Sequence, residues 1–286
     1  MSQADDIRLS FEFFPPKTAE GQEKLNKVRA DLSAFAPEFF SVTYGAGGST
    51  RSNTKDAVKS ILNAGEGAAP HLSFGGDNSE TIRELIEEYR NIGIERLVAL
   101  RGDMPSGMGG SSQLVYANEL VGFIRQEFGD HFKLEVAAYP EIHPEAKSYA
   151  EDVKYLKQKL DAGANSALTQ YFYNPDAYFF FIDQCQKAGI DKPIYPGIMP
   201  IMNYKNLARF SKSCGAEIPR WLAKRLEDFG DDNASIKAFG IDMISDLCET
   251  LLENDAPGLH FYTMNQTEPT ASIVRNLGLI PIEQES

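Results

Sequence analysis

The strongest constraint on the fold is an alternation, repeated about eight times, of short β-branched or aromatic segments with longer segments of helical periodicity. The strand-like segments are 9–14, 39–44, 71–74, 96–102, 134–140, 166–172, 193–199 and 259–264. Between them, apolar side chains recur at helical spacing, as at Ile82, Leu85, Ile86, Tyr89 and Ile92. Alternating strands and helices predict a parallel sheet, and eight units favour an α/β TIM barrel over a doubly wound open sheet.

The 286 residues contain no Pro/Ser-rich linker and no break in composition, so we expect residues 1–286 to form a single TIM-barrel domain. The segment 203–254 is too long for one helix and predicts two or three, with a new helix starting near IPRW (218–221). Neither GAGGST (45–50) nor GMGGSS (107–112) completes a dinucleotide-binding fingerprint after the first strand. The glycine-rich loops therefore do not indicate a Rossmann fold.

The chain carries a net charge of −13, which disfavours phosphate backbones and anionic membrane surfaces as partners. The acidic N-terminus shows no secretory signal, and no apolar run approaches the roughly 18 residues that span a bilayer. Three widely spaced cysteines, without a CxxC or a Cys/His cluster, indicate reduced thiols and no metal site. We expect a cytoplasmic protein with neither nucleic-acid nor membrane partners.

Polar residues gather where a barrel carries its chemistry, at the carboxyl ends of the strands. Glu12 lies within the first strand, His71 opens the third, and Gln170 lies in the sixth. The other strand ends carry Thr43, Tyr44, Arg101, Gly102, Asp103, Tyr139, Glu141, His143, Tyr262, Thr263 and Asn265. A hydrophobic core does not require so many polar residues, so the sequence indicates an active site at the carboxyl ends of the strands.

Strand alternation places Glu12 on the face of Ser10 and Phe14, opposite Phe11 and Phe13. If that face is the barrel interior, burial raises the pKa of the carboxyl and makes Glu12 a candidate general acid. An ion pair with an inward Arg or Lys is the alternative.

The other candidates also have two interpretations. Arg101 and Asp103 either approach a ligand through their glycine-rich loop or form a local ion pair. His71 and His143 are better placed to hydrogen-bond than to ligate a metal. Asp152 and Lys159 lie on a polar helix face, which by itself indicates a solvated surface.

Seven strings, in order along nearly the whole chain, resemble those of the bacterial methylenetetrahydrofolate reductases. They are SFEFFPPKT (10–18), SVTYGAGGSTR (41–51), VALRGD (98–103), AAYPEIHPEA (137–146), DAGANSALTQYF (161–172), PGIMPI (196–201) and HFYTMN (260–265). Each string alone is modest evidence, but seven in register at the expected barrel positions are highly specific.

The resemblance implies a catalytic barrel that binds FAD without a covalent link. Such an enzyme reduces 5,10-methylenetetrahydrofolate to 5-methyltetrahydrofolate by a ping-pong mechanism with NADH or NADPH, in one-carbon metabolism that supplies methionine synthesis. It implies a homo-oligomer whose partners are folate and nicotinamide.

The resemblance also assigns residues. Glu12 matches the family's general acid, which assists opening of the five-membered ring to an iminium, and Asp103 matches an aspartate beside flavin and pterin. The implied FAD site comprises Thr43, Tyr44, Ala46, His71, Arg101, Gly102, Asp103, Ala117, Tyr139, His143, Ala146, Asp152 and Lys159. The implied substrate site comprises Asp103, Gln170, Phe210 and Gln266.

The chain departs from the family pattern at Gln266, where many relatives have an Arg that can contact the nicotinamide cofactor; the exchange removes a charge and a planar donor fork. Tyr155 and Gln158 also replace residues that can touch FAD in relatives. Two other functions stay open: a barrel enzyme that handles methyl- or methylene-pterin without flavin, such as a methyltransferase, and a catalytically silent binding or assembly protein.

Overall fold

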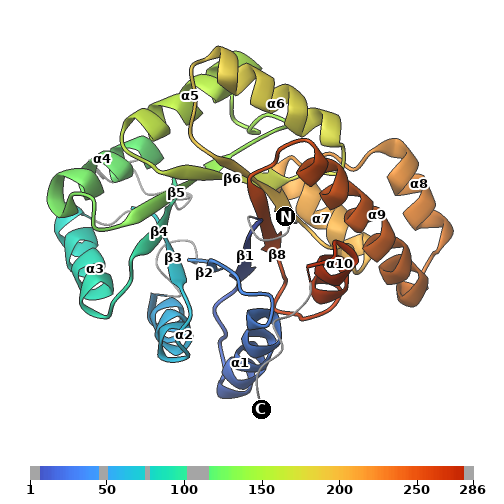
Figure 1. The fold of residues 1–286 in the computed structure, drawn as a ribbon, viewed down its shortest axis with the longest axis horizontal. Coiled ribbons are helices and arrows are strands. Elements are labelled where there is room, and N and C mark those ends of the chain that lie inside the picture. Colours follow the sequence, from blue (N-terminus) through green and yellow to red (C-terminus); the bar gives the residue numbers. More distant parts are fainter. Residues whose placement is uncertain (1–6, 45–50, 75–77, 102–115, 280–286) are drawn as a thin grey trace, which may run out of the picture.

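A computed structural model describes residues 7–44, 51–74, 78–101 and 116–279, and these form a closed barrel of eight parallel strands in sequence order. The strands are β1 (Arg8–Phe13), β2 (Phe39–Val42), β3 (Ala68–Leu72), β4 (Arg96–Ala99), β5 (Lys133–Ala138), β6 (Ser166–Tyr171), β7 (Ile194–Ile198) and β8 (Gly258–Tyr262). Figure 1 shows the helices arranged around these strands. The predicted TIM barrel is confirmed.

The helices are α1 (Ala19–Ser33), α2 (Arg51–Asn63), α3 (Ser79–Asn91), α4 (Ala117–Phe128), α5 (Tyr149–Asp161), α6 (Pro175–Lys187), α7 (Tyr204–Cys214), α8 (Arg220–Asp228), α9 (Asn233–Glu253) and α10 (Thr270–Asn276). The segment 203–254 thus holds three helices, as the sequence allowed, and α8 begins within IPRW. None of the helices in the described ranges combines the length and apolarity that crossing a bilayer requires.

The prediction for the third strand was wrong at its boundaries, because β3 begins at Ala68 instead of His71. The missed residues are Ala68, Ala69 and Pro70, whose types do not favour strands. They are nevertheless buried, and the register pairs Phe40 with Ala68 and Val42 with Pro70. Consequently His71 lies near the carboxyl end of β3, where the active site of a barrel is expected.

Alternation along each strand divides the side chains between two cores. On β1, Phe11 and Phe13 are fully buried outside the barrel, where their rings contact Phe40. Inside the barrel, a small separate cluster fills the middle layer. It consists of Phe39, Ala69, Val98, Leu168 and Tyr195, with Leu100 packed against it.

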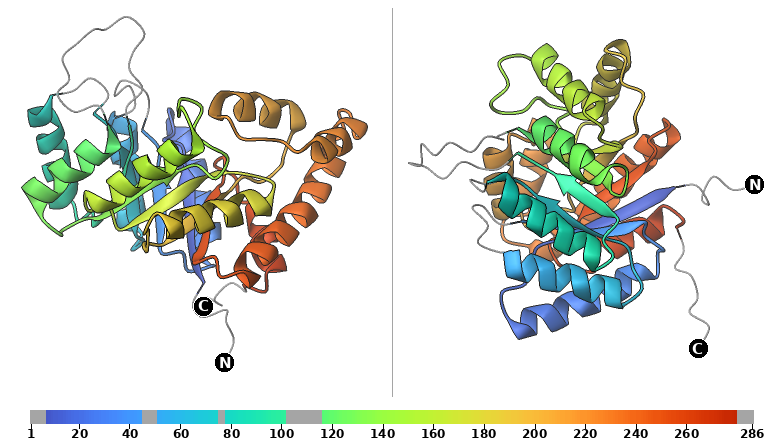
Figure 2. Two further views of the ribbon diagram at one scale, coloured as in Figure 1. Left: turned by 90° about the horizontal axis from the view of Figure 1, so that it is seen from above. Right: turned by 90° about the vertical axis from the view of Figure 1, so that its left-hand side faces the viewer.

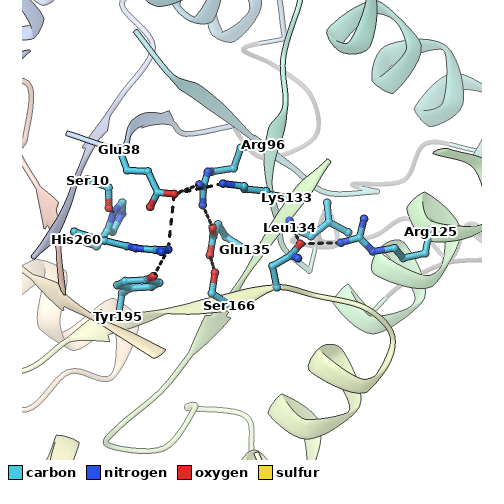
Figure 3. Close-up of polar contacts among 12 residues, drawn as sticks. Ser10, Glu38, Arg96, Arg125, Lys133, Leu134, Glu135, Ser166, Tyr195 and His260 are labelled. Atoms are coloured by element: carbon cyan, nitrogen blue, oxygen red, sulfur yellow. Dashed lines mark hydrogen bonds and ion pairs between the residues drawn. The ribbon is translucent and has the colours of Figure 1, made fainter. Parts of the chain in front are cut away.

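Below this layer, at the amino ends of the strands, lies a buried ion cluster (Figure 3). The Arg96 guanidinium, only 11% exposed, pairs with both Glu38 and the fully buried Glu135. Glu135 also accepts a hydrogen bond from the Ser166 hydroxyl. Because each buried charge has a partner, the base of the barrel tolerates a carboxylate without solvent.

We expect Arg96→Met to lower the free energy of unfolding by about 3–5 kcal/mol, because it leaves Glu135 as an unpaired buried charge. Chemical denaturation of the purified protein measures the loss. The double variant Arg96→Met/Glu135→Met is the control, since it removes both charges and should recover part of the stability. A double variant less stable than Arg96→Met would contradict this account of the cluster.

Candidate active site

A pocket of about 390 Å³ opens at the carboxyl ends of the strands. Its wall is largely apolar, with Val98, Leu100, Ala137 and Leu168 among the lining residues. Helix α7 lies at the same end of the barrel, in the upper part of Figure 2 (left), and contributes Phe210 to the wall. An apolar cavity with a few convergent polar groups is the usual form of a small-molecule site.

Glu12 lies in this pocket between two histidines. Its Oε2 atom is 3.2 Å from Nε2 of His71 and 3.5 Å from Nε2 of His260. The side chain of Glu12 is 12% exposed and that of His260 is fully buried. On its other side, His260 Nδ1 is hydrogen-bonded to the Ser10 hydroxyl at 2.7 Å. Three strands therefore bring a carboxyl, two imidazoles and a hydroxyl into one polar group.

The expectation of a raised pKa for Glu12 was wrong. Burial raises the pKa of this carboxyl, but the charges and hydrogen bonds of His71 and His260 outweigh burial and lower the pKa to about 2. The alternative of an inward ion pair was nearer the structure, although the partners are histidines instead of Arg or Lys.

Several residues of the predicted FAD and substrate sites meet in the pocket. Of the predicted FAD residues, its lining includes Thr43, Tyr44, His71 and Tyr139; of the predicted substrate residues it includes Gln170 and Phe210. The Tyr44 hydroxyl accepts a hydrogen bond from Nε of Arg51, the first residue of α2. The carboxamide of Gln170 accepts a hydrogen bond from the Tyr171 N–H at 3.0 Å, which leaves its NH₂ group to donate.

A second group of predicted FAD residues adjoins the pocket wall at β5 and α5. The ring of His143 contacts the edge of Tyr139 at 4.5 Å between centroids, and the His143 N–H donates to Oδ2 of Asp152 at 2.7 Å. Lys159 donates to the carbonyl of Ala137, and burial lowers the pKa of this lysine to about 8 against the opposing charge of Asp152. The interpretation of this helix face as solvated surface is therefore wrong for Lys159 and Asp152.

The remaining predicted residues lie outside the pocket lining. Arg101 forms an ion pair with Glu145, Ala117 begins α4, and the Ala146 N–H donates to the His143 carbonyl. Gln266 follows β8, with its N–H bonded to the Thr263 carbonyl at 3.1 Å. Ala46, Gly102 and Asp103 lie outside the described residues. Among the described residues, no group of three or more His, Cys, Asp and Glu side chains could hold a metal ion.

Sequence reasoning missed His260, although strand alternation could have found it. His260 shares the inward face of β8 with Tyr262, which lines the pocket, and the barrel register pairs it with Ser10. The pocket residues Phe14 and Met264 were missed as well, because apolar residues next to a strand end look like ordinary core.

Several known proteins are similar to this chain over most of its length. Residues 1–278 match the family model described as methylenetetrahydrofolate reductase. The chain is 41% identical to 5,10-methylenetetrahydrofolate reductase of Escherichia coli, over 96% of this chain and 92% of that protein. It is 39% identical to methylenetetrahydrofolate reductase (NADH) 1 of Arabidopsis thaliana, over 98% of this chain and 50% of that protein.

The fold is also found in a solved structure of an uncharacterized Clostridium thermocellum protein, described as binding two copies of 5-methyl-5,6,7,8-tetrahydrofolic acid. The TM-score is 0.66 at 17% sequence identity, over 96% of this chain and 94% of that one. At this identity the likeness concerns the fold alone.

The lowered pKa of Glu12 predicts a specific acid sensitivity. A carboxyl whose pKa falls from 4.5 to about 2 on folding adds stability that is fully present above pH 4.5 and is lost as the pH falls toward 2. Between pH 5 and pH 3, the free energy of unfolding should therefore fall by about 2 kcal/mol more in the wild type than in Glu12→Gln. Denaturant titrations of both proteins at the two pH values test this, and parallel pH profiles would contradict it.

Proposed function

Because the chain belongs to the methylenetetrahydrofolate reductase family, we propose that it reduces 5,10-methylenetetrahydrofolate to 5-methyltetrahydrofolate with electrons from NADH or NADPH, through noncovalently bound FAD. The observation that carries this proposal is Glu12, a carboxylate held between two imidazoles in a largely apolar pocket. Such a group can deliver a proton to a substrate ring while the apolar wall excludes water.

The residues around the pocket fit FAD. The walls offered by Leu100, Ala137 and Tyr139 suit a flat ring. The partly buried Lys159 ammonium has a lowered pKa and a carbonyl as its hydrogen-bond acceptor. An anionic group beside this lysine would favour its charged form, so a phosphate is a suitable neighbour.

We propose that FAD is held by Thr43, Tyr44, His71, Arg101, Ala117, Tyr139, His143, Ala146, Asp152 and Lys159, with Ala46, Gly102 and Asp103 from outside the described residues. When bound, FAD supplies two-electron transfer from the nicotinamide to the folate. The two substrates would occupy the pocket in turn, which is the ping-pong order.

Glu12 delivers the proton in this proposal. A carboxyl with a pKa of about 2 carries no proton near neutral pH, so Glu12 must take up a proton from water as the substrate binds. A substrate ring that covers the mouth removes the remaining water and favours neutral Glu12, which can then protonate the substrate nitrogen and assist ring opening to the iminium.

Gln170 and Phe210 would orient the substrate. The NH₂ group of Gln170 is left to donate to a ring acceptor. Phe210 is carried by α7, which is fixed by a 3.0 Å hydrogen bond between the Ser211 and Tyr171 hydroxyls. Asp103, as the carboxylate beside the pterin, stays a prediction.

The test is an anaerobic experiment on the FAD-reconstituted protein. NADH or NADPH should bleach the flavin spectrum, and 5,10-methylenetetrahydrofolate should restore it. We expect Glu12→Gln to slow the restoration about 100-fold or more, since this half-reaction needs the proton, and to leave the bleaching within about threefold of wild type.

Glu127→Gln is the matched control, because Glu127 pairs with Arg83 on the surface of the barrel. It should behave as wild type in both half-reactions. A protein that acquires no flavin colour after reconstitution would favour the pterin enzyme without flavin. Equal loss of both half-reactions in Glu12→Gln would instead contradict the role of Glu12.

A separate prediction concerns Gln266. If this position meets the nicotinamide cofactor, Gln266→Arg restores a charged donor fork and should lower the dissociation constant for the preferred nicotinamide roughly tenfold. Gln266→Lys, which restores the charge without the fork, should gain less. The concentration dependence of flavin reduction gives both constants, and an unchanged constant in Gln266→Arg would separate this position from nicotinamide binding.

A further inference from the structure

The exit of β1 is joined to the exit of β8 by hydrogen bonds of two side chains, those of Asn265 and Thr263. The two strands are neighbours in the closed barrel (Figure 1), and their backbone pairing ends at Glu12 and Tyr262. Beyond that pair, the carboxamide of Asn265 accepts a hydrogen bond from the Phe14 N–H at 2.8 Å and donates one to the Phe14 carbonyl at 2.9 Å. The side chain thus takes the place of the next peptide group of a strand.

Thr263 adds hydrogen bonds to Glu12, and we call this connection between residues 12–14 and residues 263–265 the seam. The Glu12 carbonyl accepts hydrogen bonds from the Thr263 hydroxyl at 2.7 Å and from the Thr263 N–H at 3.3 Å. The Thr263 hydroxyl in turn accepts a hydrogen bond from the Asn265 N–H at 3.2 Å. The backbone on both sides of Phe13 is therefore held by residues 263–265.

The backbone after β8 adopts an uncommon conformation to make this seam. Met264 and Asn265 both have φ of 54°, in the left-handed region that residues other than glycine seldom adopt. Asn is among the few residues that tolerate it, but Met is not. Unfavourable backbone conformations of this kind persist at functional sites when the surrounding contacts impose them.

The residues that the seam holds are pocket residues. Phe14, Met264 and Glu12 all line the cavity, with Phe14 at 43% exposure. Asn265 itself is absent from the lining, so it acts on a ligand only through these neighbours. We propose that Asn265 is a positioning residue, which sets Phe14 and Met264 about the Glu12 carboxyl so that a planar pterin ring is aligned for protonation.

This inference rests on the proposed function, and it distinguishes the two half-reactions. The nicotinamide needs only a surface on which to stack, whereas the folate must also bring one nitrogen to Glu12. A displacement of about 1 Å can cost on the order of 100-fold in rate where alignment matters. Loss of the seam should therefore impair folate reduction more than flavin reduction.

Two substitutions of Asn265 distinguish the effect of its carboxamide from the effect of its backbone conformation, and one substitution of Asn254 is the control. Asn265→Gly accepts the left-handed φ but removes both hydrogen bonds to Phe14. Asn265→Asp keeps the acceptor for the Phe14 N–H and loses the donor. Asn254→Gly is the matched control, because Asn254 also donates to a backbone carbonyl, that of Thr250 at 2.8 Å, at the carboxyl end of α9.

Hydrogen exchange measures the seam independently of activity. Phe14 is followed by Pro15 and Pro16, which have no N–H, so a peptide ending at Pro16 reports the Phe14 amide as its last exchangeable site. We expect its exchange to be at least about tenfold faster in Asn265→Gly than in wild type, with Asn265→Asp between them and Asn254→Gly unchanged. An unchanged exchange rate in Asn265→Gly would show that Asn265 does not hold the Phe14 amide, and this result does not depend on which substrate the wild type reduces.

Anaerobic rapid mixing of the same FAD-loaded proteins tests the role. For Asn265→Gly we expect reoxidation by 5,10-methylenetetrahydrofolate to be about 10–100-fold slower and reduction by the nicotinamide to stay within about threefold, with Asn265→Asp intermediate. An equal loss in both half-reactions, or none in either, would overturn the positioning role. Failure of the wild type itself to reduce the folate would overturn the proposed function. The hydrogen-exchange result would still test the seam, because it does not depend on activity.

Discussion

The closed barrel allows each strand residue only two directions, toward the axis or toward the helices, and the rest of the structure depends on how the inward positions are used. They form three layers: the Arg96 ion cluster at the base, a small apolar layer that includes Val98 and Leu168, and the polar group around Glu12 at the mouth. Since a carboxylate can be buried only beside partners, charge is confined to the two end layers.

At the mouth of the barrel, the charge of Glu12 depends on two opposing effects on its pKa, desolvation by burial and the interaction with two imidazoles. Burial alone would raise the pKa of the carboxyl, whereas His71 and His260 lower it and favour the carboxylate. A site of this kind keeps a carboxyl charged in spite of its burial. The protonation state of Glu12 can then respond to a ligand that covers the mouth of the pocket, because covering removes water from the carboxyl.

The sequence predicted the barrel because the hydrophobic periodicity of each strand and helix is a local signal. Eight strand–helix units in order are compatible with few topologies. The sequence placed Glu12 and Gln170 on strands that lead into the pocket for the same reason, whereas it put His71 at the start of the third strand instead of near its carboxyl end. It misjudged the pKa of Glu12, because His260 is 248 residues away and becomes a neighbour only when β8 closes against β1. The boundary of β3 was missed because Ala69 and Pro70 have low intrinsic strand propensity and lie in a strand only because of their packing in the barrel.

The apolar layer between the base and the mouth has a further consequence. Phe39, Ala69, Val98, Leu168 and Tyr195 fill the barrel beneath the pocket, and His260 stacks on Phe39 at 6.1 Å between ring centroids. In the described part of the chain, the pocket therefore has an apolar floor and lies at the carboxyl ends of the strands. A ring bound in this pocket would lie between Glu12 and bulk water, so any proton that Glu12 delivers would have to reach the carboxyl no later than the ring binds.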